Sequence, residues 1–467
     1  MNFDKLYING EWVDPISKEK IEVENPANKE IFGSVPAAGE EDVNRAVAAA
    51  KEAFKTWQFS TIEERKQLLN NLIPQLEKRV DQMAEIISKE LGCGIKFAKS
   101  MHVLPYIKDV RDYLAMVDNY PFEEKFDEYI VRREPIGIVG AITPWNYPLG
   151  QIMKKLSPSI LGGNAMVLKP SQKTPLVAFL LAEAIHEAGF PKGIFNLVSG
   201  RGKEVGNVLA THKDVNLITF TGSTDGGLDV ARLAIDDFKR LSLELGGKSP
   251  AIILKSADYK IALKKTLDKV YFNTGQSCSA YSRLFVPRDE KEKIEDMILE
   301  MTKEYKFGDP SDPEVLIGPV ANKKQFDKVK YYIERGIQEG AKLLIGEVPT
   351  ESHGYYIGPT VFTDVDNKME IAQNEIFGPV LCVIPYDDVD QAIEMANDTV
   401  YGLSGGVFGQ WEEAYEVAKR LRTGTLVMNN GNQLHRAPFG GFKHSGFGRE
   451  GGKFGLDEFV EIKGLFI

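Results

Sequence analysis

From residue 136 onward, short apolar runs alternate with segments of helical periodicity, and this alternation restricts the chain to a small set of folds. The apolar runs of a first series are 136–142, 165–168, 194–198, 217–220 and 241–245. Near-continuous apolar strands that alternate with helices are typical of a parallel sheet covered on both faces. We therefore predict a doubly wound α/β domain of the nucleotide-binding type.

A second alternating series follows the first and predicts a second α/β domain. Its apolar runs are 251–254, 284–286, 380–384, 403–408 and 425–428. Two segments fit neither series, namely the charged, aromatic-rich stretch 113–133 and the apolar stretch 459–467. A terminal strand without a sequential partner is expected to pair with another strand, for example in another subunit.

Ahead of the first series, the spacing of apolar residues predicts an amphipathic helix over 40–57 and a second helical stretch after Ser60. Ser60 and Glu63 have the spacing of a capping box. We expect Pro74 to break or kink the second stretch and Gly92 to end it.

Composition excludes several classes of protein. The chain has 467 residues, enough for roughly two to four domains, and its 43% hydrophobic and 27% charged residues exclude wholesale disorder. The net charge of −10 lacks the basic surplus of a general nucleic-acid or anionic-membrane binder. Neither an apolar run of about 18 residues nor a signal-peptide pattern is found, and three cysteines form no disulfide framework. We expect a soluble cytoplasmic protein that binds neither nucleic acid nor membrane.

The segment 143–148 (TPWNYP) follows an apolar strand and precedes a helix. It is therefore expected at the carboxyl end of a parallel strand, where ligands bind in open α/β sheets. Its two prolines stiffen the turn, and Asn146 offers an amide donor. Alternatively, the segment is a turn in which Trp145 only packs.

Two glycine-containing turns compete for a phosphate site. In 220–224 (FTGST), backbone N–H groups and a hydroxyl lie at the start of a helix, a suitable place for a pyrophosphate. The earlier turn 200–206 (GRGKEVG) also follows a strand and is close to a dinucleotide-binding fingerprint, with one residue too many. The pattern alone leaves both turns open.

Two further residues have the chemistry of a catalytic site. Glu244 ends an apolar strand, where a carboxylate is unusual unless it faces a cavity or a partner. Cys278 lies in a loop of small residues and is a candidate nucleophile, although a free cysteine is usually inert. Cys93 and Cys382 are expected to be inert and buried. The six histidines show no metal-ligand spacing, so no metal site is expected.

Taken together, these segments resemble the aldehyde dehydrogenase superfamily over essentially the whole chain. The motifs are 143–148, 169–171 (KPS), 220–224, 243–248 (LELGGK), 275–278 (GQSC), 375–379 (EIFGP) and 438–443 (PFGGFK). The resemblance implies two Rossmann-like domains, one for the cofactor (1–112 and 134–246) and one for catalysis (247–445). It also implies a small β oligomerisation arm (113–133 and 446–467) and a homodimer or homotetramer.

The resemblance also implies the chemistry. Cys278 would attack the aldehyde carbon, and the Asn146 side chain with the Cys278 backbone N–H would hold the resulting oxyanion. After hydride transfer to the nicotinamide, Glu244 would activate the water that hydrolyses the thioester. Lys155 would support the catalytic centre.

Residues for the cofactor, NAD or NADP, follow from the same resemblance. They are Trp145, Lys169, Gly222, Ser223, Glu375 and Phe377, with the pyrophosphate at 220–224. Many NAD-preferring members carry a glutamate where this chain has Gln172. A carboxylate there would repel a 2′-phosphate, so neutral Gln172 makes NADP admissible and the preference open.

The implied substrate pocket is unusually polar. Its residues are Tyr147, Lys154, Gln433, Arg436 and Phe439, with His435 beside them. A cationic lining would suit a carboxylated aldehyde and a semialdehyde dehydrogenase. Alternatively, the loop before Pro438 is only a solvated surface.

Three rival functions remain. A coenzyme A-acylating aldehyde dehydrogenase would generally lack the water-activating Glu244. A thiol esterase or acyl transferase would use Cys278 and Asn146 but would need neither Lys169 nor Glu375. A non-catalytic protein of the same fold would have no use for Cys278.

Overall fold

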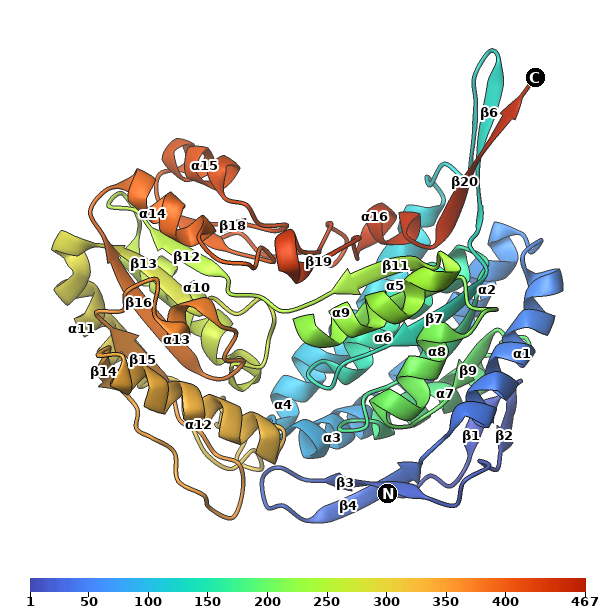
Figure 1. Cartoon of the computed structure of the whole chain (residues 1–467), viewed down its shortest axis with the longest axis horizontal. Helices are drawn as coiled ribbons and strands as arrows, with labels where there is room; N and C mark the ends of the chain where they lie inside the picture. The colour runs from blue at the N-terminus through green and yellow to red at the C-terminus, as the bar shows by residue number, and fades with distance from the viewer.

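The computed structural model describes all residues from 1 to 467. It contains two α/β units, each built on its own sheet, and a three-stranded sheet that projects from one of them (Figure 1). This arrangement confirms the predicted fold class. No helix is long and apolar enough to cross a membrane.

The first sheet has eight strands in the order β19-β11-β10-β7-β8-β9-β1-β2. Its strands are β1 (Leu6–Ile8), β2 (Glu11–Val13), β7 (Ile138–Ile142), β8 (Ala165–Lys169), β9 (Phe195–Leu197), β10 (Leu217–Thr221), β11 (Arg240–Glu244) and β19 (Gly446–Phe447). The strands β11, β10, β7, β8 and β9 are parallel, whereas β1 and β19 run antiparallel to their neighbours. Each apolar run of the first series forms one of the parallel strands.

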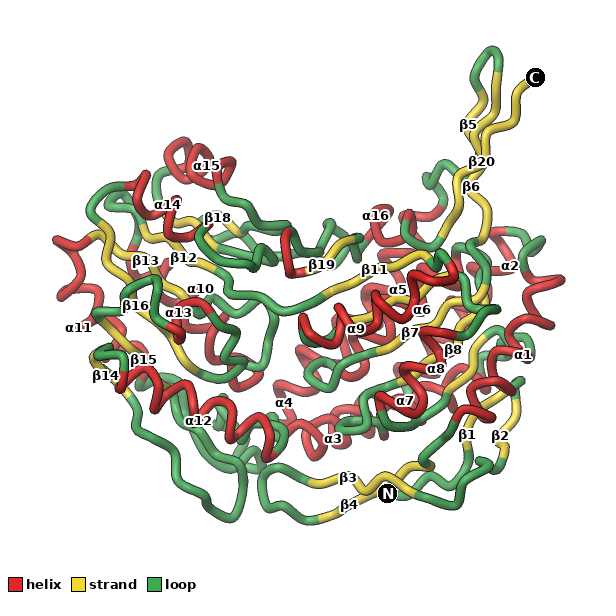
Figure 2. Tube along the Cα trace, viewed as in Figure 1, coloured by secondary structure: helices red, strands yellow, loops and turns green.

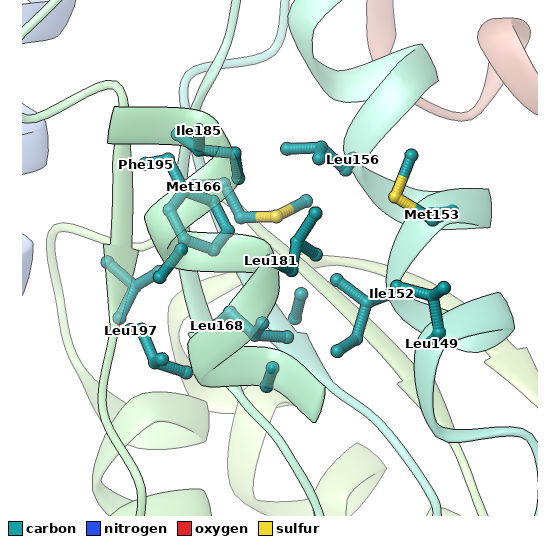
Figure 3. Packing of buried hydrophobic residues seen from close by; sticks show 14 of the residues in the cluster. Leu149, Ile152, Met153, Leu156, Met166, Leu168, Leu181, Ile185, Phe195 and Leu197 are labelled. Carbon is teal, nitrogen blue, oxygen red and sulfur yellow. The ribbon is translucent and has the colours of Figure 1, made fainter. Parts of the chain in front are cut away.

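Helices cover both faces of this sheet (Figures 1 and 2). They are α1 (Glu40–Trp57), α2 (Ile62–Glu77), α3 (Val80–Leu91), α4 (Ile95–Phe97), α5 (Leu104–Val117), α6 (Pro148–Leu161), α7 (Leu176–Glu187), α8 (Asn207–Thr211) and α9 (Thr224–Ala234), with short π-helices at Ala98–Val103 and Gly202–Gly206 and a 3-10 turn at Ile235–Asp237. Leu149 and Ile152 of α6 lie in one buried cluster with Leu168 of β8 and Leu181 of α7 (Figure 3). This packing fixes where the strand ends lie.

The helices near the N-terminus differ from the prediction in detail. The helix over 40–57 is confirmed, but the capping box of α2 is formed by Thr61 and Glu64 rather than by Ser60 and Glu63. Ser60 lies one residue before the cap, where its hydroxyl donates to the Trp57 carbonyl at 2.6 Å and accepts from Nε of Arg65 at 2.9 Å.

The second helical stretch is two helices, and α2 continues past Pro74 to Glu77. Pro74 lies in the last turn, so it removes a single backbone bond, and the buried side chain of Leu76 holds the turn in place. Gly92 ends α3 with φ of 82°, as expected of a left-handed helix cap.

The second sheet has seven strands in the order β14-β15-β16-β13-β12-β17-β18, all parallel except β14. Its strands are β12 (Pro250–Ile253), β13 (Arg283–Pro287), β14 (Lys342–Ile345), β15 (Thr360–Thr363), β16 (Val380–Tyr386), β17 (Gly406–Phe408) and β18 (Val427–Met428). Its helices are α10 (Tyr259–Tyr271), α11 (Lys291–Thr302), α12 (Lys323–Gln338), α13 (Glu370–Gln373), α14 (Val389–Asn397) and α15 (Trp411–Arg420), with 3-10 turns at Phe272–Gly275 and Arg288–Glu290. Along β16, Cys382 and Val383 belong to separate cores because alternate side chains point to opposite faces.

The projecting sheet consists of β5 (Glu123–Lys125), β6 (Tyr129–Pro135) and β20 (Val460–Phe466), in the order β20-β6-β5. The C-terminal strand therefore finds its partner within the same chain, from Val460 opposite Pro135 to Phe466 opposite Tyr129. The stretch 113–133 is only partly strand, since α5 runs to Val117. The chain is completed by the hairpin β3 (Lys20–Glu24) with β4 (Ile31–Pro36), the 3-10 turn Lys443–Ser445 and α16 (Gly452–Asp457).

Candidate active site

A cleft of about 850 Å³ opens at the carboxyl ends of β7, β8 and β10. β10 and β7 are neighbours in the sheet but not in the sequence, so the connections from these strands leave in different directions. Ligands of doubly wound sheets bind at such a switch point. Ile142, Lys169 and Thr221, the last residues of the three strands, all line the cleft.

Both glycine-containing turns border this cleft. Gly202 and Gly206 line it from the earlier turn, and Gly222 and Ser223 line it from the later one. Ser223 is the N-cap of α9, where its hydroxyl accepts from the backbone N–H of Gly226 at 3.2 Å. The two turns that compete in the sequence are thus two walls of one cleft.

The cleft is rich in cations with few partners. Its charged lining residues are Lys169, Lys173, Lys203, Arg232, Lys324, Lys328 and Asp229. Lys169 is buried, and its Nζ donates only to the Pro170 carbonyl at 3.0 Å. Because burial disfavours the ammonium, the pKa of Lys169 falls to about 8. Beside it, Oε1 of Gln172 is buried without a hydrogen-bond donor.

A smaller cavity of about 130 Å³ continues from the cleft toward the second domain. Trp145, Gly222 and Ser223 line both spaces. Asn146, Cys278, Glu375 and Phe377 line the smaller one. The predicted nucleophile, oxyanion donor and nicotinamide-ribose contacts therefore share one cavity.

The loop that carries Cys278 is held by unusual backbone geometry. Asn273 and Thr274 both have φ of 55°, and Gly275 has φ of 70°. A Cβ on Gly275 would lie 2.1 Å from the Gly378 carbonyl oxygen, so only glycine fits there. Backbone strain of this kind is common where a side chain must be aimed at a site.

Asn146 is fixed by the same loop. Its Nδ2 donates to the Gln276 carbonyl at 2.9 Å, and Nδ2 of Asn273 donates to the Asn146 carbonyl at 2.9 Å. An amide nitrogen has two N–H groups, so one remains for a ligand in the cavity.

The Cys278 thiol is protonated in this environment. Burial raises the pKa of Cys278 to about 12, and the nearby carboxylates of Glu375 and Glu244 act in the same direction. The protonated thiol is therefore a weak nucleophile. It becomes reactive when positive charge enters the cavity or a base takes its proton.

Glu244 lies 3% exposed at the end of β11, and both of its carboxylate oxygens lack a hydrogen-bond partner. Burial raises the pKa of Glu244 well above its ordinary value, and the negative charge of Glu450 raises it further. A buried carboxyl group whose pKa is shifted toward neutrality is suited to general acid–base work.

A buried ion cluster stands next to Glu244. Lys155 donates through Nζ to Oε1 of Glu450 and to Oγ1 of Thr221, both at 2.7 Å. Nζ of Lys154 lies 3.1 Å from Oε2 of the same Glu450. Although burial opposes ionisation, the two ammonium groups lower the pKa of Glu450 to about 2. Glu450 is therefore the permanent anion of the pair, while Glu244 can take up a proton.

Glu375 and Phe377 are positioned from the second domain. Oε1 of Glu375 accepts from the backbone N–H of Gly247 at 2.9 Å. Gln325 on α12 donates to the carbonyls of Ile376 and Phe377 at 3.0 and 2.8 Å. The Phe377 ring meets the Trp145 ring edge-on at 5.4 Å. These contacts fix Glu375 and Phe377 at the wall of the smaller cavity.

Among the predicted substrate residues, Lys154 and Tyr147 have defined partners, whereas Arg436 has none. Lys154 lies 4.5 Å over the Phe439 ring and forms an ion pair with Glu450, so it is not an unpaired cation. The Tyr147 ring stacks on the His102 ring with 4.7 Å between their centres. The Arg436 side chain is exposed to solvent and has no ion pair, as expected of a solvated loop.

Several residues of the site have no signal in the sequence. Glu450, Gln325 and Lys328 are ordinary polar residues until the fold brings them to Glu244 and Glu375. Gln433 contacts Lys269 of α10, which no motif includes, and His435 contacts Asp109 of α5. Only a contact between segments far apart in sequence reveals them.

Comparison with known proteins agrees with this geometry. Residues 12–465 match the model of the family described as the aldehyde dehydrogenase family. The structure resembles aldehyde dehydrogenase C from Pseudomonas syringae, solved as a mutant with NAD+ and octanal, with 43% identity and a TM-score of 0.97 over 99% of this chain and 96% of that one. It also resembles an aldehyde dehydrogenase from Mycobacterium tuberculosis solved with NAD+ (39% identity, TM-score 0.97, 100% and 98% covered) and one from Bartonella henselae (37%, 0.97, 100% and 99%). The chain belongs to the aldehyde dehydrogenase family and is an oxidoreductase that acts on the aldehyde group.

Proposed function

We propose that the protein oxidises an aldehyde to a carboxylic acid with NAD or NADP, through a covalent intermediate on Cys278. The observation that carries the proposal is the single cavity lined by Cys278, Asn146, Glu375 and Phe377, which opens into a cleft of dinucleotide size. An aldehyde has no leaving group, so hydride can depart only after a nucleophile has made the carbon tetrahedral.

The residues divide the work as follows. Cys278 releases its thiol proton to solvent, and the thiolate forms a bond to the aldehyde carbon. The resulting oxyanion accepts hydrogen bonds from Asn146 Nδ2 and from the Cys278 backbone N–H. The bound nicotinamide supplies the hydride acceptor. Loss of hydride leaves a thioester, and Glu244 takes a proton from the water that attacks it. The carboxylic acid leaves and the Cys278 thiol is restored.

The cofactor is proposed to lie in the cleft, with its pyrophosphate at Gly222 and Ser223 on the N-terminus of α9. Lys169 has an unsatisfied ammonium beside Gln172 and suits ribose hydroxyls, while Glu375 suits the nicotinamide ribose. The Pseudomonas and Mycobacterium structures contain NAD+, which supports a nicotinamide dinucleotide here. Because Gln172 is neutral and exposed Lys203 lines the same cleft, we propose that NADP is accepted as well as NAD.

Assembly and location are proposed from the resemblance and the exposed arm. β20 is an edge strand of the small sheet, and Ile462 and Phe466 on it are 70% and 88% exposed. An apolar edge strand of this kind needs a covering partner. We propose a homodimer or homotetramer joined through residues 113–133 and 446–467, in the cytoplasm.

The test is the initial rate of reduced nicotinamide formation over an aldehyde panel, with NAD and with NADP. The panel contains octanal, shorter aliphatic, aromatic and carboxylated aldehydes, and Cys278→Ala is the control. We expect a rate that depends on Cys278 without coenzyme A. A rate that appears only with coenzyme A would contradict the hydrolytic role of Glu244 and favour the acylating reaction. Ester hydrolysis without any aldehyde oxidation would contradict the proposal as a whole.

A further inference from the structure

The helix that leads into the Cys278 loop contains a lysine without a carboxylate partner. Lys269 lies in the last turn of α10, nine positions before Cys278, and is only partly exposed. Its Nζ contacts Oε1 of Gln433 at 3.4 Å and lies 5.9 Å from the centre of the Tyr281 ring. No Asp or Glu oxygen lies within 4 Å of this ammonium.

The neighbouring turn of α10 has the same character. Nζ of Lys265 donates to the Gly431 carbonyl at 3.3 Å and to Oδ1 of Asn432 at 2.9 Å. The loop 431–433, which leads to the predicted substrate residues, thus lies along two lysines and offers them only neutral oxygens. By contrast, Lys264 on the same helix pairs with Asp268.

Lys269 is electrostatically coupled to the catalytic centre. Burial lowers the pKa of Lys269, a Cys278 thiolate raises it, and the Lys154 ammonium lowers it. Lys154 has a carboxylate partner, Glu450 at 3.1 Å, which Lys269 lacks. A half-buried ammonium with neutral partners gains most from an anion that a ligand brings.

We propose that Lys269, supported by Gln433, binds an anionic group, carboxylate or phosphate, at the end of the substrate remote from the aldehyde. This inference rests on the proposed oxidation at Cys278 and names the class of aldehyde that the site prefers. It assigns to Lys269 the charge recognition that the sequence alone suggests for Lys154 and Arg436. The ammonium stays in place while the aldehyde end reacts, so its loss weakens binding more than it slows chemistry.

The first experiment compares aldehydes of equal length that end in a methyl group, a carboxylate or a phosphate. In the wild type, we expect kcat/KM to favour one or both anionic aldehydes over the neutral one. Lys269→Met should raise KM for the preferred anionic aldehyde by about 10- to 100-fold with little change in kcat or in the neutral aldehyde. Lys269→Arg should restore most of the preference, because it keeps the charge.

The matched control is Lys260→Gln, which removes an exposed charge from the first turn of the same helix. We expect this variant to keep the wild-type preference. Equal kcat/KM for neutral and anionic aldehydes in the wild type, or equal losses for both in Lys269→Met, would overturn the role of Lys269 while leaving aldehyde oxidation in place. Melting temperatures of the variants exclude unfolding as the cause of a loss.

A second experiment needs no aldehyde oxidation. Cys278 is alkylated by iodoacetate, which is anionic, and by iodoacetamide, which is neutral and of similar size. A change in the Cys278 pKa alters both rates equally, so the ratio of the two rates reports attraction of the anion alone. We expect Lys269→Met to lower this ratio severalfold and Lys260→Gln to leave it unchanged; an unchanged ratio in Lys269→Met would contradict the proposal.

Discussion

Two buried lysines of the first α/β unit differ in how their charge is used. Lys155 is 1% exposed, and its ammonium donates to Glu450 and Thr221. Lys169 is 5% exposed, and its ammonium donates only to a backbone carbonyl. Lys155 is thus part of a buried ion cluster within the folded chain. Lys169 is costly to the free protein, as its pKa of about 8 shows, and has its hydrogen-bonding capacity left for a ligand.

The same contrast separates the two regions to which these lysines belong. In the cleft at the ends of β7, β8 and β10, six cationic side chains and one aspartate line an open space, which is a suitable field for a polyanion. Beside Glu244, Lys154 and Lys155 share the carboxylate of Glu450 in a closed space, and the charges of all three act on the pKa of Glu244. We therefore expect unpaired charge where a ligand binds and paired charge where the pKa of a neighbour is set.

The largest effect is expected from breaking the ion cluster. Glu450→Gln leaves Lys154 and Lys155 buried without a carboxylate and should lower the free energy of unfolding by about 3–5 kcal/mol. The control is Glu461→Gln, which removes the exposed partner of Arg240 at 3.4 Å and should cost about 1 kcal/mol at most. Urea titrations of both variants measure the difference, and equal losses would show that the cluster does not stabilise the fold.

Asn146→Ala tests the oxyanion role in the catalytic cavity. Removing the Nδ2 donor should lower kcat by about 10²–10³-fold, since the donor acts on charge that develops in the transition state. Cofactor affinity, measured by fluorescence titration, should stay at the wild-type value. A change in cofactor affinity without a change in kcat would move Asn146 from catalysis to cofactor binding.

Lys169→Met sharpens the contrast between the two lysines. We expect the dissociation constant of the cofactor to rise by about 10- to 100-fold, because one charge-assisted hydrogen bond is lost. The free energy of unfolding should not fall, since an unpaired buried ammonium is replaced by an apolar side chain of similar length. A marked loss of stability would mean that Lys169 has a partner in the folded chain.

Glu244→Gln tests the shifted carboxyl group through the pH dependence of stability. The pKa of Glu244 is raised in the folded protein, so the folded state holds a proton that the unfolded chain releases near its ordinary pKa. Wild-type stability should therefore fall as pH rises from the unfolded to the folded pKa, by about 1.4 kcal/mol per unit of displacement. The variant lacks this loss. When melting temperatures are measured from about pH 5 to pH 9, the variant should therefore gain stability relative to the wild type as pH rises. The same pH dependence in both proteins would contradict the raised pKa of Glu244.

The place of several residues that line the cleft could be predicted from the sequence, for a physical reason. Lys169, Ser223 and Asn146 follow single strands, and parallel strands bring their carboxyl ends to one edge whatever the rest of the chain does. Even so, the pattern could not choose between the turns 200–206 and 220–224. The structure shows both at the cleft, because the strands before them end at the same edge.

On the catalytic and substrate sides, residue chemistry indicates Glu244 and Cys278 as candidates, but several of their neighbours could not be predicted. Glu450, Gln325 and Lys269 come from the C-terminal segment, α12 and α10, and they meet the site through packing between domains. The local sequence pattern does not indicate which charged side chains form ion pairs in the folded protein. The lysine expected to be free, Lys154, is paired with Glu450, and Lys269 is the one left without a carboxylate. The domain boundaries given above stay a prediction.

The most direct test of the account follows a single turnover of the Glu244→Gln variant with cofactor and an accepted aldehyde. Reduced nicotinamide and the mass of the acid-quenched protein are recorded together. The account predicts a burst of reduced nicotinamide equal to the number of active sites, followed by slow turnover, with the acyl group of the aldehyde attached to Cys278. A burst without an adduct, or an adduct in Cys278→Ala, would contradict a thioester at Cys278 that Glu244 helps to hydrolyse.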